Sequence, residues 1–247
     1  MTYRFATLKE NYEDYSSGRV FYGSPGATGF PVRLASEIFQ RCAARLTASG
    51  IEPPYTVYDP CCGGGYSATI IGYLHGDKLE KIYASDVSPE AIELAKRNLA
   101  LLQPSGLNER ITEIRGLIER FQKQSHINAL ESSLRLKTKL DRRRPIPAKC
   151  FRFDILSNDD LAREVQKVDL VQTDLPYGQV ASWRGLTDVD TPRAQKLLIN
   201  IRPVLKSTSI VAITTSKTEA VSYDGYRRLE HTKIGKRRLL ILEPTGL

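Results

Sequence analysis

Asp174 and the residues after it form the part of the sequence best suited to chemistry. Leu175, Pro176 and Tyr177 follow Asp174 directly, and the strand expected over 168–173 precedes it. A planar sp² nitrogen is a weak nucleophile because its lone pair is delocalised into the ring. A carboxylate that accepts its proton restores electron density, an aromatic face holds the ring in line, and proline keeps the turn rigid. The pattern favours Asp174, Pro176 and Tyr177 as catalytic residues, although in isolation it also fits an ordinary β-turn.

A glycine cluster indicates where a cofactor binds. The segment 59–65, Asp-Pro-Cys-Cys-Gly-Gly-Gly, joins a short strand to a helix, and glycine lets a backbone approach a ligand closely. Asp86 ends the next strand, where a carboxylate can accept hydrogen bonds from both ribose hydroxyls of an adenosine. NAD enzymes share both features, and Asp86 also fits a helix-capping role. The predicted cofactor-binding residues are Asp59, Pro60, Cys61, Gly63, Gly65, Asp86, Val87 and Asp154.

The elements that must position these residues alternate along the chain. Strands are expected at 56–58, 81–86, 151–154, 168–173 and 209–214, followed by a β-hairpin over 226–242. Helices are expected from Pro31 onward and over 66–75, 89–102, 161–166 and 193–201. Such alternation is typical of a doubly wound α/β sheet, in which ligands bind beyond the carboxyl ends of the strands. The four aspartates at strand ends should therefore lie near one another.

The alternation stops between residues 104 and 149, where two amphipathic helices are expected instead. One has its apolar positions at Leu107, Ile111, Ile114, Ile118 and Phe121, and the other at Ile127, Leu130 and Leu134. We therefore expect a single domain over 1–247, with an N-terminal arm and helix over 1–50 and a basic helical insertion over 104–149.

Positive charge is concentrated in two segments. The net charge of the 247 residues is +8; residues 104–149 hold 11 Lys or Arg against 5 acidic residues, and residues 226–238 hold 6 against 1. Such clustering favours a polyanionic partner, although charge runs are also found on solvated faces. The chain shows no apolar leader or membrane-spanning stretch, and its four cysteines lack the spacing of a zinc site. We expect a cytoplasmic protein without a metal or a membrane partner.

With these residues placed, the sequence resembles the avilamycin (orthosomycin) resistance methyltransferases, which modify a guanine of 23S ribosomal RNA. Residues 174–177 also resemble motif IV of amino-group methyltransferases, (Asp/Asn/Ser)-Pro-Pro-aromatic, with Leu175 where proline is usual. The doubled cysteine beside the glycines makes its stretch the most specific. The resemblance is carried by residues 17–20, 30–35, 57–66, 85–87, 97–102 and 174–178.

The resemblance implies a Rossmann-like class I methyltransferase with a seven-stranded sheet and helices on both faces. It implies S-adenosylmethionine as methyl donor, a guanine of 23S rRNA as acceptor at N1 or N2, and resistance to orthosomycin antibiotics. Asp59, Gly63 and Gly65 would hold the methionine end of the donor, Asp86 the ribose and Asp154 the adenine amine. Asp174 would accept the guanine proton or a hydrogen bond, with Tyr177 stacked on the base.

The surface that meets RNA is expected from the basic segments and from residues near the active-site face. The predicted RNA-binding residues are Arg19, Arg33, Arg142, Arg143, Arg144, Trp183, Arg237 and Arg238. Trp183 fits core or lid packing equally well. The main alternative is another RNA or DNA amino-group methyltransferase. An NAD-dependent oxidoreductase leaves Asp174 and Tyr177 without a role, and a non-catalytic RNA-binding protein explains only the charge. A monomer is expected.

Overall fold

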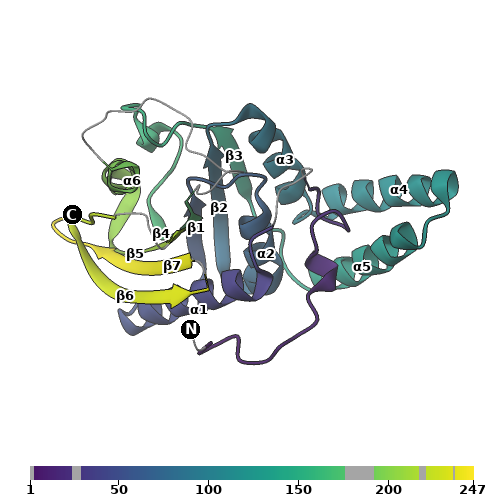
Figure 1. Ribbon diagram of the computed structural model, residues 1–247, viewed down its shortest axis with the longest axis horizontal. Helices are drawn as coiled ribbons and strands as arrows, with labels where there is room; N and C mark the ends of the chain where they lie inside the picture. Colours follow the sequence, from purple (N-terminus) through teal and green to yellow (C-terminus); the bar gives the residue numbers. More distant parts are fainter. Residues whose placement is uncertain (1–2, 24–28, 176–191, 217–220, 236) are drawn as a thin grey trace.

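Seven strands form one mixed sheet in the computed structural model, which describes residues 3–23, 29–175, 192–216, 221–235 and 237–247 (Figure 1). The strands are β1 (Tyr55–Asp59), β2 (Leu79–Asp86), β3 (Ala148–Arg152), β4 (Val168–Asp174), β5 (Leu205–Ser216), β6 (Tyr226–Ile234) and β7 (Arg237–Pro244). Their order is β3-β2-β1-β4-β5-β7-β6, with β1 to β5 parallel and β7 antiparallel to both neighbours. The predicted seven-stranded α/β sheet is confirmed.

Helices cover both faces of the sheet, as expected. Neighbouring residues of a strand point to opposite faces. Val57 and Leu170 accordingly join the core beneath α1 (Val32–Ala48), α2 (Tyr66–His75) and α3 (Pro89–Ala100), while Tyr58 and Val171 join the core beneath α6 (Arg193–Ile201). Because both faces are covered, the central strands are buried along most of their length.

Several helix starts follow local sequence rules. Pro31 is the N-cap of α1, so the helix begins one residue later than expected. The Ser88 hydroxyl accepts a hydrogen bond from the Ala91 N–H at the start of α3, with Pro89 in the first turn. The helix expected over 161–166 is wrong, since only a 3-10 turn, Leu161–Arg163, forms there. The chain must straighten again to enter β4 at Val168, which leaves no room for further turns.

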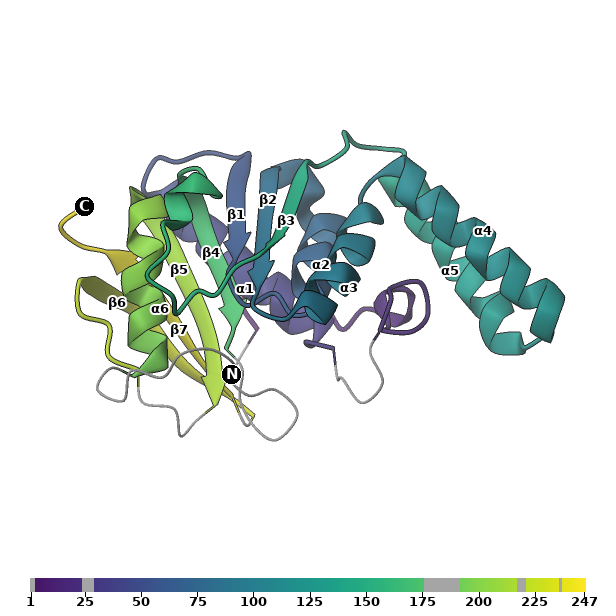
Figure 2. The same cartoon turned by 90° about the horizontal axis from the view of Figure 1, so that it is seen from above.

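The insertion is a pair of long helices, α4 (Pro104–Phe121) and α5 (Gln124–Leu140), that project from the side of the sheet (Figures 1 and 2). The expected apolar face of α5 is wrong in part: Ile127 and Leu134 are exposed, whereas Leu130 packs against the core. The buried face of α5 contains small residues, which let the two helices approach closely, and consists of Ala129, Ser132, Ser133, Leu136 and Leu140. No helix within the described ranges is long and apolar enough to span a membrane.

A buried charge network joins the N-terminal arm to α1 and β6. The fully buried Glu37 carboxylate accepts hydrogen bonds from the backbone N–H groups of Arg4, Phe5 and Ala6, at 2.6, 3.0 and 2.7 Å. It also pairs with Arg41, which in turn pairs with Glu230 on β6. Burial alone would raise the pKa of Glu37, but these donors outweigh it and the pKa is lowered. The arm is therefore fastened to the domain by an ionised side chain.

Candidate active site

The carboxyl ends of β2, β1 and β4 bring three of the predicted aspartates to one edge of the sheet. Asp86, Asp59 and Asp174 are the last residues of these adjacent strands. Because parallel strands all end at the same edge, side chains far apart in the sequence meet there. Asp154, expected at the end of the third strand, lies two residues beyond β3 instead, because β3 begins and ends earlier than predicted.

The loop between β1 and α2 forms an open cradle beside Asp86. Gly63 and Gly65 have φ values of +50° and +72°, which disfavour any side chain. The Gly63 N–H donates to Asp86 Oδ2 at 2.9 Å, and the Ser88 N–H donates to Oδ1 at 3.0 Å. A Cβ added at Gly63 would meet open space, so the loop presents bare backbone outward. Each carboxylate oxygen keeps a lone pair for a ligand, so this cradle fits the ribose and amino-acid ends of a nucleoside cofactor.

Asp59 supports the floor of the site. Its Oδ1 accepts a hydrogen bond from the Thr173 hydroxyl at 2.8 Å and from the Cys61 N–H at 3.2 Å. Burial raises the pKa of Asp59 to about 7, and the charges of Asp86 and Asp174 act in the same direction. Asp59 thus ties the end of β1 to the end of β4.

The remaining predicted cofactor residues surround this cradle. Pro60 is buried, and its carbonyl accepts a long hydrogen bond from Ser85, while Cys61 and Val87 are partly exposed. Asp154 accepts the Leu156 N–H at 2.9 Å, which forms a tight turn and leaves its second oxygen for another donor.

Asp174 lies at the end of β4 with one carboxylate oxygen buried and without a hydrogen-bond partner among the described residues. The next residue, Leu175, is buried and donates its N–H to the Thr214 carbonyl at 2.8 Å, which continues the pairing with β5. Asp174 Oδ1 is buried and has no hydrogen-bond partner among the described residues. Burial raises the pKa of Asp174 to about 7, although Arg237 acts to lower it. Pro176, Tyr177 and Trp183 lie outside the described residues.

The arginines predicted to bind RNA separate into different places. Arg33 donates to the carbonyls of Ala6 and Thr7, both at 2.8 Å, and Arg143 donates to the Gly72 and Tyr73 carbonyls, so both guanidinium groups hold the protein's own chain. The expectation that these two face RNA does not fit their positions. Arg19 pairs with Glu13 at 3.2 Å and stays partly exposed.

Arg142 and Arg144 are exposed but lie at the far edge of the sheet. Arg144 pairs with Glu80 at 2.8 Å and donates to the Leu79 carbonyl, at the first residues of β2. The length of β2 places this edge roughly 23 Å from Asp86. Arg237 and Arg238 begin β7, and Arg237 lies beside Asp174 rather than on an outer surface.

Asn98 is a site-building residue that motif reasoning did not single out. It is fully buried; its side-chain amide donates to the Gly64 carbonyl at 2.8 Å and the Tyr22 carbonyl at 3.0 Å, and accepts the Tyr22 N–H at 2.8 Å. The same side chain therefore holds both the arm and the glycine loop. The sequence signal is a polar residue on the apolar side of a helix, in line with Ile92, Ala95 and Leu99.

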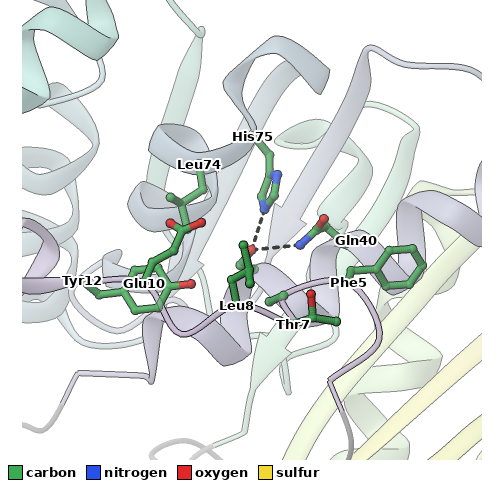
Figure 3. Close-up of a pocket in the computed structure, with 10 residues that line it drawn as sticks. Phe5, Thr7, Leu8, Glu10, Tyr12, Gln40, Leu74 and His75 are labelled. Carbon is green, nitrogen blue, oxygen red and sulfur yellow. Dashed lines mark hydrogen bonds between the residues drawn. The ribbon is translucent and has the colours of Figure 1, made fainter.

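A cavity of about 290 Å³ lies between the arm and the end of α2 (Figure 3). The Ser36 hydroxyl bonds His75 Nε2 at 2.9 Å and Gln40 Nε2 at 3.1 Å. Burial lowers the pKa of His75 to about 4, so its ring is neutral at pH 7. The cavity lies at the opposite end of α2 from the glycine loop, about 15 Å away. It is therefore separate from the site at the strand ends, and its Ser36, Gln40 and His75 side chains bond one another.

The strand order, the reversed β7, the glycine loop after β1 and the carboxylate at the end of β2 together define a class I methyltransferase. The chain belongs to the family described as rRNA methyltransferase AviRa, which it matches over residues 1–237. It is 37% identical over 243 residues to the 23S rRNA (guanine(2535)-N(1))-methyltransferase of Streptomyces viridochromogenes, a match covering 97% of this chain and 95% of that protein.

Two solved structures support the same assignment. Both are rRNA methyltransferase AviRa from Streptomyces viridochromogenes, with TM-scores of 0.84 and 0.87. Each is 36% identical to this chain, and each match covers 98% of this chain and 96% of the other. The predicted family, fold class and enzyme class are confirmed.

Proposed function

We propose that this enzyme transfers a methyl group from S-adenosylmethionine to N1 of a guanine in 23S rRNA, and that the methylated RNA confers resistance to orthosomycin antibiotics. The observation that carries the proposal is the buried Asp174 Oδ1, which has no hydrogen-bond partner among the described residues and lies next to the cofactor cradle. The similar Streptomyces enzyme is named for the same reaction at guanine N1.

The donor would be held by the loop and the aspartates around it. S-adenosylmethionine supplies an electrophilic methyl group on its sulfonium. Asp86 would accept hydrogen bonds from the ribose hydroxyls, the bare backbone at Gly63 would face the methionyl part, and Asp154 would accept the adenine amine. Gly65 would shape the loop from its buried place against Ala95 of α3. Asp59 would keep the ends of β1 and β4 together beneath the donor.

Replacing Asp86 with alanine should weaken the binding of S-adenosylhomocysteine by about 100-fold, because two hydrogen bonds to a charged acceptor are lost. Calorimetric titration measures the affinity. The matched control is Asp77→Ala, since Asp77 is an exposed aspartate at the far end of α2. Equal affinities for Asp86→Ala and the control would refute the ribose assignment.

The acceptor nitrogen is chosen on the chemistry of Asp174. Guanine N1 carries a single proton that must leave before or during methyl transfer, and a general base works best with a pKa near the working pH. With its pKa raised to about 7 by burial, Asp174 would be about half ionised at neutral pH. The exocyclic N2 has a second N–H and needs no full proton loss before attack. We therefore favour N1.

Contact with RNA is proposed for the outer end of the α4–α5 pair, here called the hairpin tip (Arg115, Arg120, Phe121 and Lys123). All four residues are exposed, and Phe121 is 49% exposed although it is apolar. The pair slants so that this end extends toward the side where the parallel strands end (Figure 2). A stacked guanine must be extruded at a cost of a few kcal/mol, which phosphate contacts at the hairpin tip would help to offset.

Reversing Arg115, Arg120 and Lys123 to glutamate should weaken RNA binding by about tenfold at moderate salt and lower the salt-dependence slope by about 2. Binding of S-adenosylhomocysteine should not change. Filter binding across a salt series measures the RNA affinity and its dependence on salt. Arg142→Glu, at the far edge of the sheet, serves as comparison: if it weakens binding more than the triple variant, RNA contacts the opposite edge.

The proposed reaction is tested by tritium transfer from labelled S-adenosylmethionine to separate pools of 23S rRNA, 16S rRNA, transfer RNA and DNA. Digestion to nucleosides then identifies the product. Label confined to unmodified 23S rRNA and eluting as 1-methylguanosine is the expected result. The N2-methyl product, or label in another pool, would overturn the proposed acceptor.

A further inference from the structure

Arg237 is the first residue of β7, and its guanidinium lies against the Asp174 carboxylate. Arg237 Nε is 3.9 Å from Asp174 Oδ1, and each side chain is 29% exposed. The guanidinium carbon also lies 5.4 Å from the centre of the Phe30 ring, just before α1. A positive charge therefore lies beside the carboxylate that would accept the guanine proton in the proposed reaction.

The sheet register holds Arg237 in this place. Asp174 pairs with Thr214 on β5, and Thr214 pairs with Leu239 on β7. Arg237 is two residues from Leu239, so its side chain leaves the same face of the sheet, the face that α1 covers. Asp174 leaves that face too, since Gln172, two residues earlier, bonds the Ala35 carbonyl in α1. A side chain on a strand is more firmly oriented than one on a loop.

We propose that Arg237 is a positioning residue for methyl transfer, which holds the Asp174 carboxylate toward guanine N1 and stays as counter-ion when negative charge passes to the base. This inference rests on the proposed function. The N1 proton moves to the Asp174 carboxylate, and the N–H electron pair remains on the base, spread over N1 and O6. The N1–CH₃ bond then forms as the donor's S–CH₃ bond breaks. Asp174 finally releases its proton to solvent.

The groups around Asp174 explain why a cation matters there. Burial raises the pKa of Asp174, and the nearby Asp59 on β1 is a buried carboxyl whose own pKa is raised to about 7. Thr214 on β5 and Phe30 before α1 carry no charge. Arg237 on β7 acts in the opposite direction and lowers the pKa of Asp174. Without Arg237, Asp174 would bind its own proton too tightly to accept one from the base at neutral pH.

The test is the pH dependence of single-turnover methyl transfer with donor and RNA at saturation. The acid limb is the part of the pH–rate profile in which the rate rises as Asp174 loses its proton. In Arg237→Gln this limb should move to higher pH by about one unit or more, because an opposite charge within about 4–6 Å lowers a carboxyl pKa by at least that amount. The rate at pH 7 should then fall by about fivefold or more. Arg237→Lys keeps the charge and should restore most of the acid limb.

Arg163→Gln is the control for the loss of one positive charge, because the Arg163 side chain is 83% exposed and lies on the 3-10 turn before β4. It should leave both the rate and the acid limb unchanged. Circular dichroism and thermal unfolding establish that each variant is folded. An acid limb in folded Arg237→Gln that coincides with that of the wild type, while the rate falls, would reduce Arg237 to a structural residue and overturn the inference.

A second readout separates this inference from the proposed reaction. Carbon-13 labelling of the aspartates lets NMR follow the ionisation of Asp174 without any substrate, and Asp174→Asn identifies its signal. A wild-type enzyme that makes no 1-methylguanosine refutes the proposed function, whatever Arg237 does. If product forms but the Asp174 signal titrates identically in wild type and Arg237→Gln, the role of Arg237 alone is refuted.

Discussion

Replacing Asp174 with asparagine is expected to lower the rate of methyl transfer by about 10²–10⁴-fold while donor binding is retained. The amide cannot take the guanine proton, yet it keeps the size of the carboxyl group and leaves the Gly63–Asp86 cradle intact. Single-turnover assays at saturating donor measure the rate, and calorimetry with S-adenosylhomocysteine measures the binding. Transfer at the wild-type rate in Asp174→Asn would exclude Asp174 as the base.

The same substitution is expected to stabilise the fold at alkaline pH. Burial raises the pKa of Asp174 from 3.8 to about 7, so the folded protein holds a proton that the unfolded chain releases. This contribution to stability is complete below pH 4 and is lost as the pH rises through 7. An amide avoids this loss. The unfolding free energy of Asp174→Asn minus that of the wild type should therefore be about 2–4 kcal/mol higher at pH 8 than at pH 4. Urea unfolding at both pH values measures it; no relative gain at pH 8 would show that Asp174 is not desolvated.

Replacing Glu37 with alanine is expected to lower the unfolding free energy by about 3–5 kcal/mol, because it breaks a buried charge network and leaves donors without their acceptor. The backbone N–H groups of Arg4, Phe5 and Ala6 lose their partner, and Arg41 loses one of its two carboxylates. Chemical denaturation measures the stability, and limited proteolysis near residues 4–6 should show the arm released.

Glu93→Ala is the matched control for this prediction. Glu93 pairs with Lys96 on α3 at 2.7 Å, but its side chain is 71% exposed, so the same truncation should cost under about 1 kcal/mol. Equal losses for Glu37→Ala and Glu93→Ala would mean that the arm contributes little to stability. The pH dependence has a definite sign: since the pKa of Glu37 is lowered, its contribution is present above pH 4.5 and disappears as the medium is acidified.

The arm is also joined to the candidate active site through Asn98 and Tyr22. Arg97 and Arg110 lie over the Tyr22 ring at 3.7 and 4.4 Å, and Asn98 joins the Tyr22 backbone to Gly64 of the glycine loop. Arg110 belongs to α4, so the arm connects the helical pair proposed to meet RNA with the loop proposed to hold the donor. Release of the arm should therefore weaken donor binding as well as the fold.

Local patterns in the sequence determined most of the architecture. The alternation of apolar strands with amphipathic helices predicted the order of elements, because each pattern depends on residues only a few positions apart. The aspartates Asp59, Asp86 and Asp174 were predicted to meet for a similar reason, since parallel strands end at one edge. The position of Asp154 shifted because strand boundaries are the least certain part of such a prediction.

The tertiary structure alone decided where individual charged side chains point. Arg143 and Arg33 look like surface charges in the sequence, yet they bond backbone carbonyls more than 25 positions away. The small buried face of α5 depends on how closely α4 approaches it, and the contact of Arg237 with Asp174 depends on the antiparallel register of β7 against β5. These features arise from pairings between distant segments, whose geometry is set only when the whole sheet and its helices pack together.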